Sequence, residues 1–239
     1  MKIIEDRYNG ITIDISTISS DVEIFQKEIK ELLFNQHGKN LLWITIDIQK
    51  SHYIPILTKL GFIFHHCNEN NITLVKKLIK NPIIPTAKNH TLGVGAMAIK
   101  ENEILVIKNK FSRGYMLPGG HIDNNESISS ALVREVFEET GVQVEFESVI
   151  NISHFTQGQF GESNMYIIST VKVIDDTITI YDTQEILDAK WIDVDMYLND
   201  EYTNDYNKNI VTAYINNKTQ KLSKDEIKLN IQSQYEVFI

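Results

Sequence analysis

The sequence predicts an α/β fold in two successive parts, and three observations support this prediction. Strand-like runs alternate with two helical patterns over residues 1–80. In the remainder, strand-like runs surround one strongly patterned helical segment at residues 127–141. Between the parts, "KNPIIPTAKNH" contains Pro82 and Pro85, which remove backbone donors and restrict their predecessors. This stretch is therefore the predicted linker.

The composition indicates an ordinary globular protein in a reducing compartment. Of the 239 residues, 42% are hydrophobic and 23% are charged, which supplies enough apolar material for a sizeable core. Apolar runs are shorter than the about 18 residues of a membrane span, and the N-terminus lacks the apolar segment of a secretory signal. Cys67 is the only cysteine, so neither an internal disulfide nor a Cys-based zinc site is expected. We expect a cytoplasmic protein with no membrane partner.

The formal net charge of -9 argues against nucleic acid as a partner, since a basic face normally supplies most of that affinity. The charge is compatible with a phosphorylated small molecule. A divalent cation can lie between an acidic protein and a phosphate and attract both.

The first part is predicted to be a small β-α-β-α-β-β unit. Residues 10–15 place Ile11, Ile13 and Ile15 on one face of a strand. Residues 20–38 have apolar side chains at helical spacing and end on a glycine stop. The other elements expected are a buried strand over 41–48, a short helix over 51–61, and strands over 62–66 and 72–79.

The second part opens with a predicted hairpin over residues 94–109, whose two β-rich runs flank a short polar turn. "GVGAM", residues 93–97, has the glycine spacing of a dinucleotide-binding turn, but it precedes a strand instead of following one. We interpret it as the start of that strand. The other elements expected are strands over 142–152, 163–174 and 177–182, a strand running into a short helix over 189–200, and a weakly helical tail over 207–217 and 222–239.

The helical segment carries an unusual cluster of acidic residues. Ser127 is a good N-cap residue, and Gly141 is a helix stop. At about 100° per residue, Glu135, Glu138 and Glu139 gather on one side of the helix. The apolar side chains that gather on a different side are Leu132, Val133, Val136 and Phe137. One face is therefore expected to be buried, while the other presents carboxylates.

Two interpretations of this acidic cluster compete. A solvated acidic face explains the apolar stripe but not the clustering, because like charges at these spacings destabilise a helix and Arg134 can neutralise only one. A bound Mg²⁺ would supply the missing positive charge, since it takes oxygen ligands, waters and substrate phosphate. Gly119 and Gly120 precede the helix, where they allow a tight turn and can offer a bare carbonyl to a ligand.

These residues carry a resemblance to a known family. The Nudix hydrolase signature is Gly, five residues, Glu, seven residues, Arg-Glu, an aliphatic residue, any residue, Glu-Glu, any residue, Gly and an aliphatic residue. Nine constrained positions over 23 residues make the match specific. They are filled here by Gly120, Glu126, Arg134, Glu135, Val136, Glu138, Glu139, Gly141 and Val142.

The resemblance implies metal-dependent hydrolysis of a diphosphate linkage in a nucleoside diphosphate derivative. Mg²⁺ or Mn²⁺ would neutralise developing charge and hold phosphate and water in line. Arg134 would orient the glutamates, and Glu126 would support the loop. The metal ligands implied are the Gly120 carbonyl, Glu135, Glu138 and Glu139.

The resemblance leaves two residues as the general base. Glu135 is one, and Glu185 in "DTQEILDAKW" is the other, because many Nudix enzymes place such a Glu shortly before a Trp-containing strand. Glu185 is equally well explained as an exposed loop acid.

A second resemblance covers nearly the whole chain. The segments that carry it are "YNGITIDIS", "SHYIPILTKLGFIFHH", "HTLGVGAMAI", "GQFGESNMYIIS" and the signature itself. Together they are similar to a Nudix subgroup with an N-terminal acetyltransferase-like (GNAT-like) pre-domain, some members of which cleave ADP-ribose or NADH. Other members are linked to CoA derivatives. The Gly-rich acyl-CoA loop of a working acetyltransferase is missing here, so we interpret the pre-domain as a structural or dimerising module, which allows a homodimer.

The implied fold is a Nudix α-β-α sandwich with a mixed sheet behind a small GNAT-like α/β domain. The implied boundaries are 1–84 for the pre-domain, 85–90 for the linker, 91–205 for the Nudix domain and 206–239 for a partly helical C-terminal extension. ADP-ribose or NADH is the expected substrate. The alternatives are a Nudix hydrolase of nucleoside triphosphates or CoA derivatives, and a non-catalytic nucleotide-binding regulatory module.

Five residues are candidates for contacting the substrate. His154, Gln157 and Phe160 follow the signature in a predicted loop that approaches the substrate in the resembling subgroup. An ordinary surface loop explains them equally well. Phe111 and Tyr115 precede the signature, where they are suited to stacking on an adenine or, alternatively, to core packing.

Overall fold

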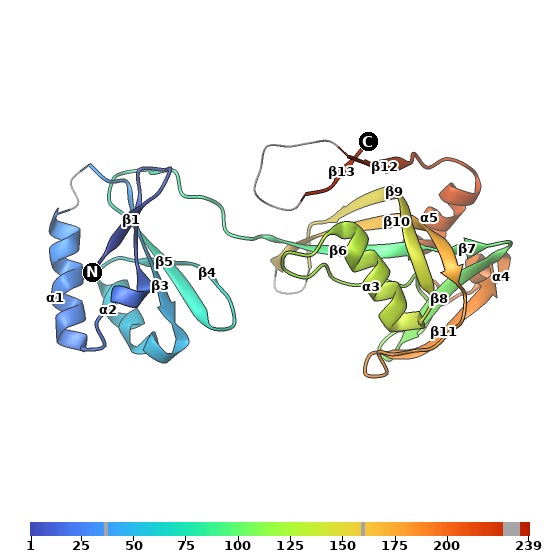
Figure 1. The fold of residues 1–239 in the computed structure, drawn as a ribbon, viewed down its shortest axis with the longest axis horizontal. Helices are drawn as coiled ribbons and strands as arrows, with labels where there is room; N and C mark the ends of the chain where they lie inside the picture. Colours follow the sequence, from blue (N-terminus) through green and yellow to red (C-terminus); the bar gives the residue numbers. More distant parts are fainter. Residues whose placement is uncertain (36–37, 159–160, 227–234) are drawn as a thin grey trace. The chain divides into compact units, whose positions relative to one another are not determined.

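The structure is a computed structural model that describes residues 1–35, 38–158, 161–226 and 235–239. The chain divides into two compact units, Met1–Asn89 and His90–Ile239 (Figure 1), and each is described by itself. Among the described residues, no helix is long and apolar enough to cross a membrane.

In the residues that the structure describes, the first unit is a five-stranded sheet with strand order β1-β2-β3-β5-β4 and two α-helices. β2 and β3 are parallel, and the other neighbouring pairs are antiparallel. Phe25 of α1 stacks on Tyr53 with ring centroids 4.1 Å apart. The elements are β1 (Ile3–Glu5), β2 (Ile11–Ile13), α1 (Val22–Asn35), β3 (Leu41–Asp47), α2 (Ile54–Lys59), β4 (Ile63–Cys67) and β5 (Asn71–Lys77), with short 3-10 helices at Ile15–Thr17 and Ile48–Tyr53. The predicted order of strands and helices is confirmed, with β1 as an addition.

The described part of the second unit contains two sheets with strand orders β13-β12-β9-β10-β6 and β11-β8-β7. β10 is parallel to β6 and antiparallel to β9. The strands are β6 (His90–Met97), β7 (Ile99–Lys100), β8 (Glu103–Asn109), β9 (Gln143–Phe155), β10 (Ser163–Asp175), β11 (Ile186–Asp193), β12 (Leu222–Asp225) and β13 (Val237–Phe238). The helices are α3 (Ile128–Thr140), α4 (Val194–Asn199) and α5 (Asp205–Ile215).

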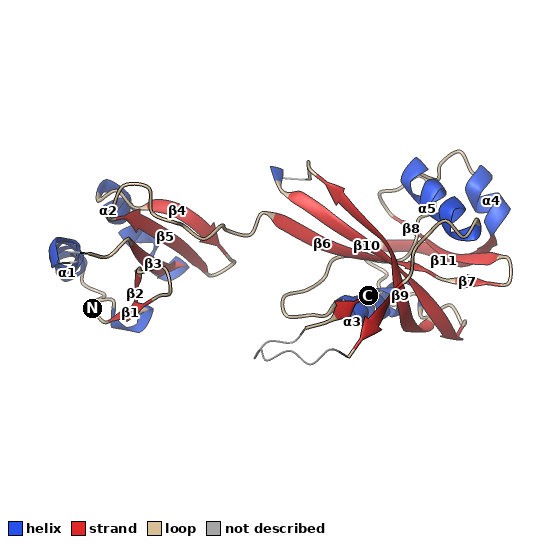
Figure 2. Ribbon diagram, turned by 90° about the horizontal axis from the view of Figure 1, so that it is seen from above, coloured by secondary structure: helices blue, strands red, loops and turns tan. Residues whose placement is uncertain are grey.

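Helices lie on both sides of these strands, which gives the mixed α/β sandwich that the sequence predicts. Figure 2 shows α3 on one side and α4 with α5 on the other. Ala131, Leu132 and Val136 of α3 pack with Val94 and Ala96 of β6 in one core cluster. A second core cluster joins β6, β8 and β10 to α4 and α5. The strand β6 therefore has its two faces in different cores.

The prediction of a strand over residues 177–182 is wrong, because these residues form no strand. The segment is extended, but its N–H groups cap a helix instead of joining a ladder. Thr179 donates to the carbonyl of Thr140 at 2.8 Å, and Tyr181 donates to that of Glu138 at 3.1 Å. The alternating pattern correctly indicated an extended chain, and the partner of that chain is the C-terminus of α3.

The tail is only partly as predicted. A helix forms at Asp205–Ile215, as the pattern of residues 207–217 indicates. The weakly helical assignment of residues 222–239 is wrong in the described part, where β12 pairs with both β9 and β13. Pairing with a strand so distant in the sequence leaves no local signal.

Candidate active site

The helix α3 has the ends that the sequence predicts. Ser127 is the N-cap, and its hydroxyl accepts the N–H of Ser130 at 3.1 Å. Gly141 is the C-cap, with φ at 78°, and its N–H donates to Phe137. A side chain at Gly141 would meet the Thr179 carbonyl oxygen at 2.5 Å, so glycine is required there for conformation and for space.

The N-terminus of α3 has a second anchor that no local pattern indicates. Glu236, next to β13, accepts the N–H of Ile128 at 2.7 Å and contacts the Ser129 hydroxyl. Lys224 of β12 pairs with the same carboxylate at 2.8 Å. Burial opposes ionisation of Glu236, yet Lys224 and Ser129 hold its pKa below the ordinary value. The C-terminal strands thus place a carboxylate where a helix N-terminus favours one.

Arg134 contacts several parts of the acidic cluster at once. Its guanidinium makes two 2.8 Å bonds to Glu126 and one bond of 3.1 Å to the His121 carbonyl. The Nη1 atom alone donates to Glu135 at 2.9 Å and to Glu138 at 3.0 Å. The Arg134 contact lowers the pKa of Glu126. One cation therefore joins the loop before α3 to two of its glutamates.

Glu139 is the unexpected member of the cluster, because it is only 5% exposed. Its single described partner is the N–H of Gly119, at 2.7 Å. Burial raises the pKa of Glu139 to about 8, against the Gly119 bond and with the help of the Glu135 and Glu185 charges. The interpretation of the cluster as a solvated acidic face is therefore wrong for Glu139.

The two glycines before α3 allow the chain to lie against these carboxylates. Gly119 has φ at 148°, and a Cβ there would lie 2.1 Å from the Val94 carbonyl oxygen. A Cβ at Gly120 would lie 2.6 Å from Glu135 Oε2. The Gly120 carbonyl accepts the Val94 N–H at 2.9 Å, which leaves one of its lone pairs for another ligand. Burial is the main cause that raises the pKa of Glu135.

These residues fit a hard divalent cation. All the donors are oxygens, and a buried carboxylate with a raised pKa lacks a countercharge. Within the described ranges, no group of three or more His, Cys, Asp or Glu side chains is arranged so that it could hold a metal ion by itself. Mg²⁺ does not require such a group, since it usually keeps several waters and binds one or two carboxylates plus substrate phosphate.

Glu185 approaches the cluster from the start of β11. Its backbone N–H bonds to Asp182 at 3.2 Å, and its carbonyl accepts the Lys110 N–H at 3.0 Å. The side chain is exposed, and its negative charge contributes to the raised pKa of Glu139. The structure thus brings Glu185 into electrostatic range of α3, although it lies 46 positions after Glu139 in the sequence.

The substrate candidates that precede α3 differ in their surroundings. Phe111 is 89% exposed, so its ring is not part of the core. Tyr115 is part of the second core cluster, and its hydroxyl donates to Asp188 at 2.6 Å. Lys190 lies over the Tyr115 ring, 4.0 Å from its centroid. Phe111 is free to stack on a ligand, whereas Tyr115 is already held by protein.

The candidates that follow α3 are on β9 and just beyond it. His154 is exposed, and its Nε2 lies 3.0 Å from Nε2 of His90 while the two rings stack. Gln157 is exposed in the following turn. Phe160 lies outside the described residues.

Tyr166 of β10 also belongs to this region, although it is not among the site residues predicted from the sequence. Burial and the negative charges of Glu139 and Glu135 raise its pKa. The signal that indicates it is the "GVG" at residues 93–95, whose glycines face its ring.

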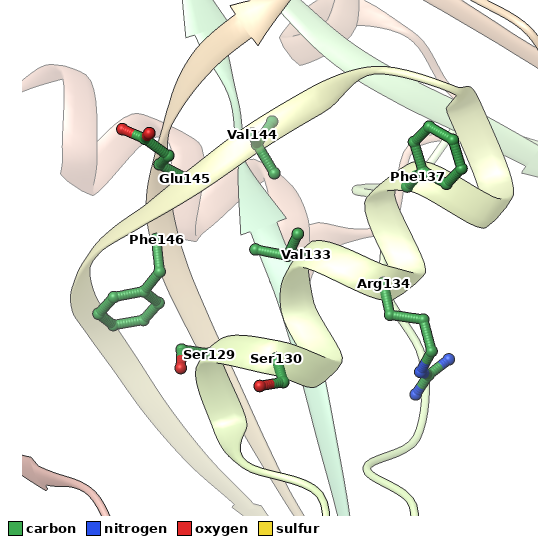
Figure 3. Close-up of a pocket in the computed structure, with 8 residues that line it drawn as sticks. All are labelled: Ser129, Ser130, Val133, Arg134, Phe137, Val144, Glu145 and Phe146. Atoms are coloured by element: carbon green, nitrogen blue, oxygen red, sulfur yellow. The ribbon is translucent and has the colours of Figure 1, made fainter.

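A separate groove of about 590 Å³ lies between α3 and β9 (Figure 3). The carboxylates of Glu135, Glu138 and Glu139 are not part of its lining. The lining residues are Ser129, Ser130, Val133, Arg134, Phe137, Val144, Glu145 and Phe146.

The carboxylates of one helix, the carbonyl of the preceding turn and the arginine between them would suit a hydrolase that works with a bound metal ion. Comparison with known proteins supports the hydrolase class. A NUDIX domain model matches residues 89–214, and a model described as a Nudix hydrolase domain matches residues 1–78. The chain belongs to the Nudix hydrolase family. Members of this family generally use divalent metals such as Mg²⁺ and act on nucleotide-derived small molecules.

Several curated relatives are similar over most of the chain. The human protein "Nucleoside diphosphate-linked moiety X motif 6" is 34% identical over 202 residues, which cover 79% of this chain and 64% of that protein. "Nudix hydrolase 8" of Arabidopsis thaliana is 31% identical over 198 residues, covering 79% of this chain and 53% of its own. The chain thus spans between half and two thirds of the length of these relatives. A solved NUDIX hydrolase from Nitrosomonas europaea is 18% identical, with a TM-score of 0.48, over 66% of this chain and 86% of its own.

Proposed function

We propose that the chain hydrolyses the diphosphate linkage of a nucleoside diphosphate derivative, ADP-ribose or NADH, with a divalent metal ion. The observation that carries this proposal is the buried Glu139, held by the Gly119 N–H with its pKa raised to about 8. A carboxylate in that state is suited to a cation that binds with the substrate. The name of the human relative, "Nucleoside diphosphate-linked moiety X motif 6", supports the same class of substrate.

The proposed metal ligands are the Gly120 carbonyl, Glu135, Glu138 and Glu139. When bound, Mg²⁺ or Mn²⁺ supplies Lewis-acid stabilisation of the phosphate oxygens. Arg134 holds Glu135 and Glu138 through one nitrogen, at 2.9 and 3.0 Å, and so orients both toward the same side. Because the guanidinium also bonds to Glu126, the loop and the helix keep a fixed relation.

Of the two candidate bases, we favour Glu185. Glu135 is held by Arg134 and lies against Gly120, which suits a metal ligand. The Glu185 side chain is exposed and bonds to no other described side chain, so it is free to accept the proton of the attacking water. Water then attacks phosphorus, the bond to the bridging oxygen breaks, and two phosphorylated products leave.

The proposed substrate contacts are Phe111, Tyr115, His154, Gln157 and Phe160. Phe111 offers an exposed ring for an adenine, whereas Tyr115 is half-buried with Lys190 over its ring. The first unit is proposed to be a GNAT-like module with a structural or dimerising role, and the protein is proposed to act in the cytoplasm.

A substrate panel tests the proposal. Purified protein with Mg²⁺ is incubated with ADP-ribose, NADH, ATP and CoA, and nucleoside monophosphate release is measured. We expect AMP from ADP-ribose or NADH, none after EDTA, and none from Glu138→Gln. Glu147→Gln is the matched control, because Glu147 is exposed on β9 outside the cluster.

The other outcomes identify the alternatives. Preferential turnover of ATP or CoA would assign a different substrate to the same chemistry. Nucleotide binding without turnover of any diphosphate would indicate a regulatory binding module and contradict the hydrolase proposal.

A further inference from the structure

Tyr166 lies flat against two glycines of the neighbouring strand. In the parallel pairing of β10 with β6, Tyr166 is the register partner of Gly93. A Cβ at Gly93 would lie 2.6 Å from Cδ2 of the ring, and a Cβ at Gly95 would lie 2.8 Å from the hydroxyl oxygen. Any side chain at either position would displace the tyrosine. The "GVG" spacing, which is not a dinucleotide-binding turn, thus makes room for this ring.

The hydroxyl end of Tyr166 is beside the loop that carries the proposed metal ligand. Gly95, which contacts the hydroxyl, has its Cα 2.7 Å from the Cβ position of Gly119. The N–H of Gly119 in turn holds Glu139. Gly93, at the other end of the ring, has its Cβ position 3.3 Å from the Gly120 carbonyl oxygen. The tyrosine, the two glycine pairs and the buried carboxylate therefore form one contiguous group.

The hydroxyls of two neighbouring tyrosines are hydrogen-bonded to protein groups, unlike the Tyr166 hydroxyl. The Tyr206 hydroxyl bonds to Asn151 at 2.9 Å and to Ser153 at 3.0 Å. The Tyr115 hydroxyl bonds to Asp188. In the described part of the chain, the Tyr166 hydroxyl makes no hydrogen bond to another residue. The hydroxyl is also not one of the fully buried polar atoms that lack a partner there. Its donor is therefore available to a ligand.

We propose that the Tyr166 hydroxyl donates a hydrogen bond to a phosphate oxygen of the bound nucleotide. The inference rests on the proposed function of the same site and adds a substrate contact that the signature does not contain. A tyrosine phenol is protonated at neutral pH, so it acts as a donor and not as a base. A phosphate oxygen would supply the acceptor that this hydroxyl lacks, and its negative charge would strengthen the hydrogen bond.

The test compares Tyr166→Phe with Tyr197→Phe. Tyr166→Phe keeps the ring against Gly93 and Gly95 and removes only the hydroxyl. Tyr197→Phe makes the same change at a fully buried tyrosine of the same core cluster, outside the proposed site. The measurements are kcat/KM for ADP-ribose, the affinity for ADP in the presence of Mn²⁺, the affinity for Mn²⁺ alone, and the melting temperature.

For Tyr166→Phe we expect kcat/KM and the ADP affinity to fall roughly 10- to 100-fold, as for the loss of a charge-assisted hydrogen bond. Mn²⁺ affinity and melting temperature should stay close to those of the wild type, and Tyr197→Phe should retain full activity. An ADP affinity within about twofold of the wild type would overturn the inference.

The proposed function can fail separately. If the wild type hydrolyses no diphosphate, that proposal is wrong, but the ADP comparison still decides whether Tyr166 contacts a phosphate. If the wild type also does not bind ADP with Mn²⁺, the inference is overturned as well.

Discussion

The backbone N–H of Gly119 donates a 2.7 Å hydrogen bond to Glu139 Oε2, the carboxylate that α3 buries beneath its acidic face. One N–H group is a weak substitute for the water that Glu139 has lost. The folded protein is therefore under electrostatic stress at this position, and a bound cation would relieve it.

The first prediction concerns stability without metal. Since the folded pKa of Glu139 is about 8 and its ordinary value is 4.5, the folded state binds the extra proton between these limits. The free energy of unfolding should fall as pH rises from 4.5 to 8. Glu139→Gln removes the group that has to ionise in the folded state. The free energy of unfolding of Glu139→Gln minus that of the wild type should therefore increase by on the order of 2 to 4 kcal/mol between pH 5 and pH 9. Thermal and urea unfolding in EDTA measure it.

Bound metal should offset the stability that the wild type loses relative to Glu139→Gln as pH rises. Mg²⁺ should raise the melting temperature of the wild type more at pH 8 than that of Glu139→Gln, because binding to the folded state alone stabilises it. Parallel pH profiles for the two proteins in EDTA would show that Glu139 is not under this stress.

The second prediction concerns Arg134→Lys. A single ammonium cannot span Glu126, Glu135 and the carbonyl of His121 as the guanidinium does. We expect the free energy of unfolding to fall by about 1 to 3 kcal/mol and kcat to fall about 100-fold as the glutamates lose their alignment. Arg7→Lys, an exposed change in the first unit, is the control. Unchanged kcat with unchanged stability would mean that the Arg134 contacts are incidental.

The third prediction assigns the base. Glu185→Gln should lower kcat by about 100-fold or more, with Mn²⁺ affinity retained, since a general base contributes on that order. Part of the lost rate should return as pH rises, because hydroxide replaces the missing base. Full activity of Glu185→Gln would move the role to Glu135.

The fourth prediction concerns the C-terminal anchor of α3. Glu236→Gln removes the charge that Ile128 and Lys224 contact, so the free energy of unfolding should fall by about 1 kcal/mol. Because the folded pKa of Glu236 is lowered, this contribution is present above its ordinary value and is lost as pH falls through the folded value. Glu226→Gln, an exposed neighbour, controls for the loss of charge. Equal melting temperatures of Glu236→Gln and wild type at neutral pH would contradict the anchor.

The local elements were predictable because their signals are local. Ser127 and Gly141 define the ends of α3 by capping chemistry that does not depend on the rest of the fold. The hydrogen-bond partners of residues 177–182 could not be predicted in this way. The alternating pattern there indicates an extended chain but not which carbonyls accept its N–H groups. Likewise, β12 pairs with β9 far back in the sequence, where the pattern of Leu222–Asp225 gives no indication of a partner.

The site shows the same division. Spacing alone places Glu135, Glu138 and Glu139 on one side of a helix. Spacing does not show that Glu139 is buried or that the Gly119 N–H bonds to its carboxylate, because both depend on tertiary contacts. Spacing also does not indicate that Tyr166 lies near the site. That position follows only from the pairing of β10 with β6, which places the Tyr166 ring against Gly93 and Gly95.

The most direct test of the central claim is the metal dependence of one reaction in two proteins. Mn²⁺ binding and AMP release from ADP-ribose are measured together for the wild type and for Glu138→Gln. We predict that the wild type loses all activity in EDTA and regains it in step with Mn²⁺ binding, whereas Glu138→Gln binds Mn²⁺ more weakly and releases no AMP. AMP release that persists in EDTA, or in Glu138→Gln at the wild-type rate, would contradict the assignment of the α3 carboxylates as the metal site.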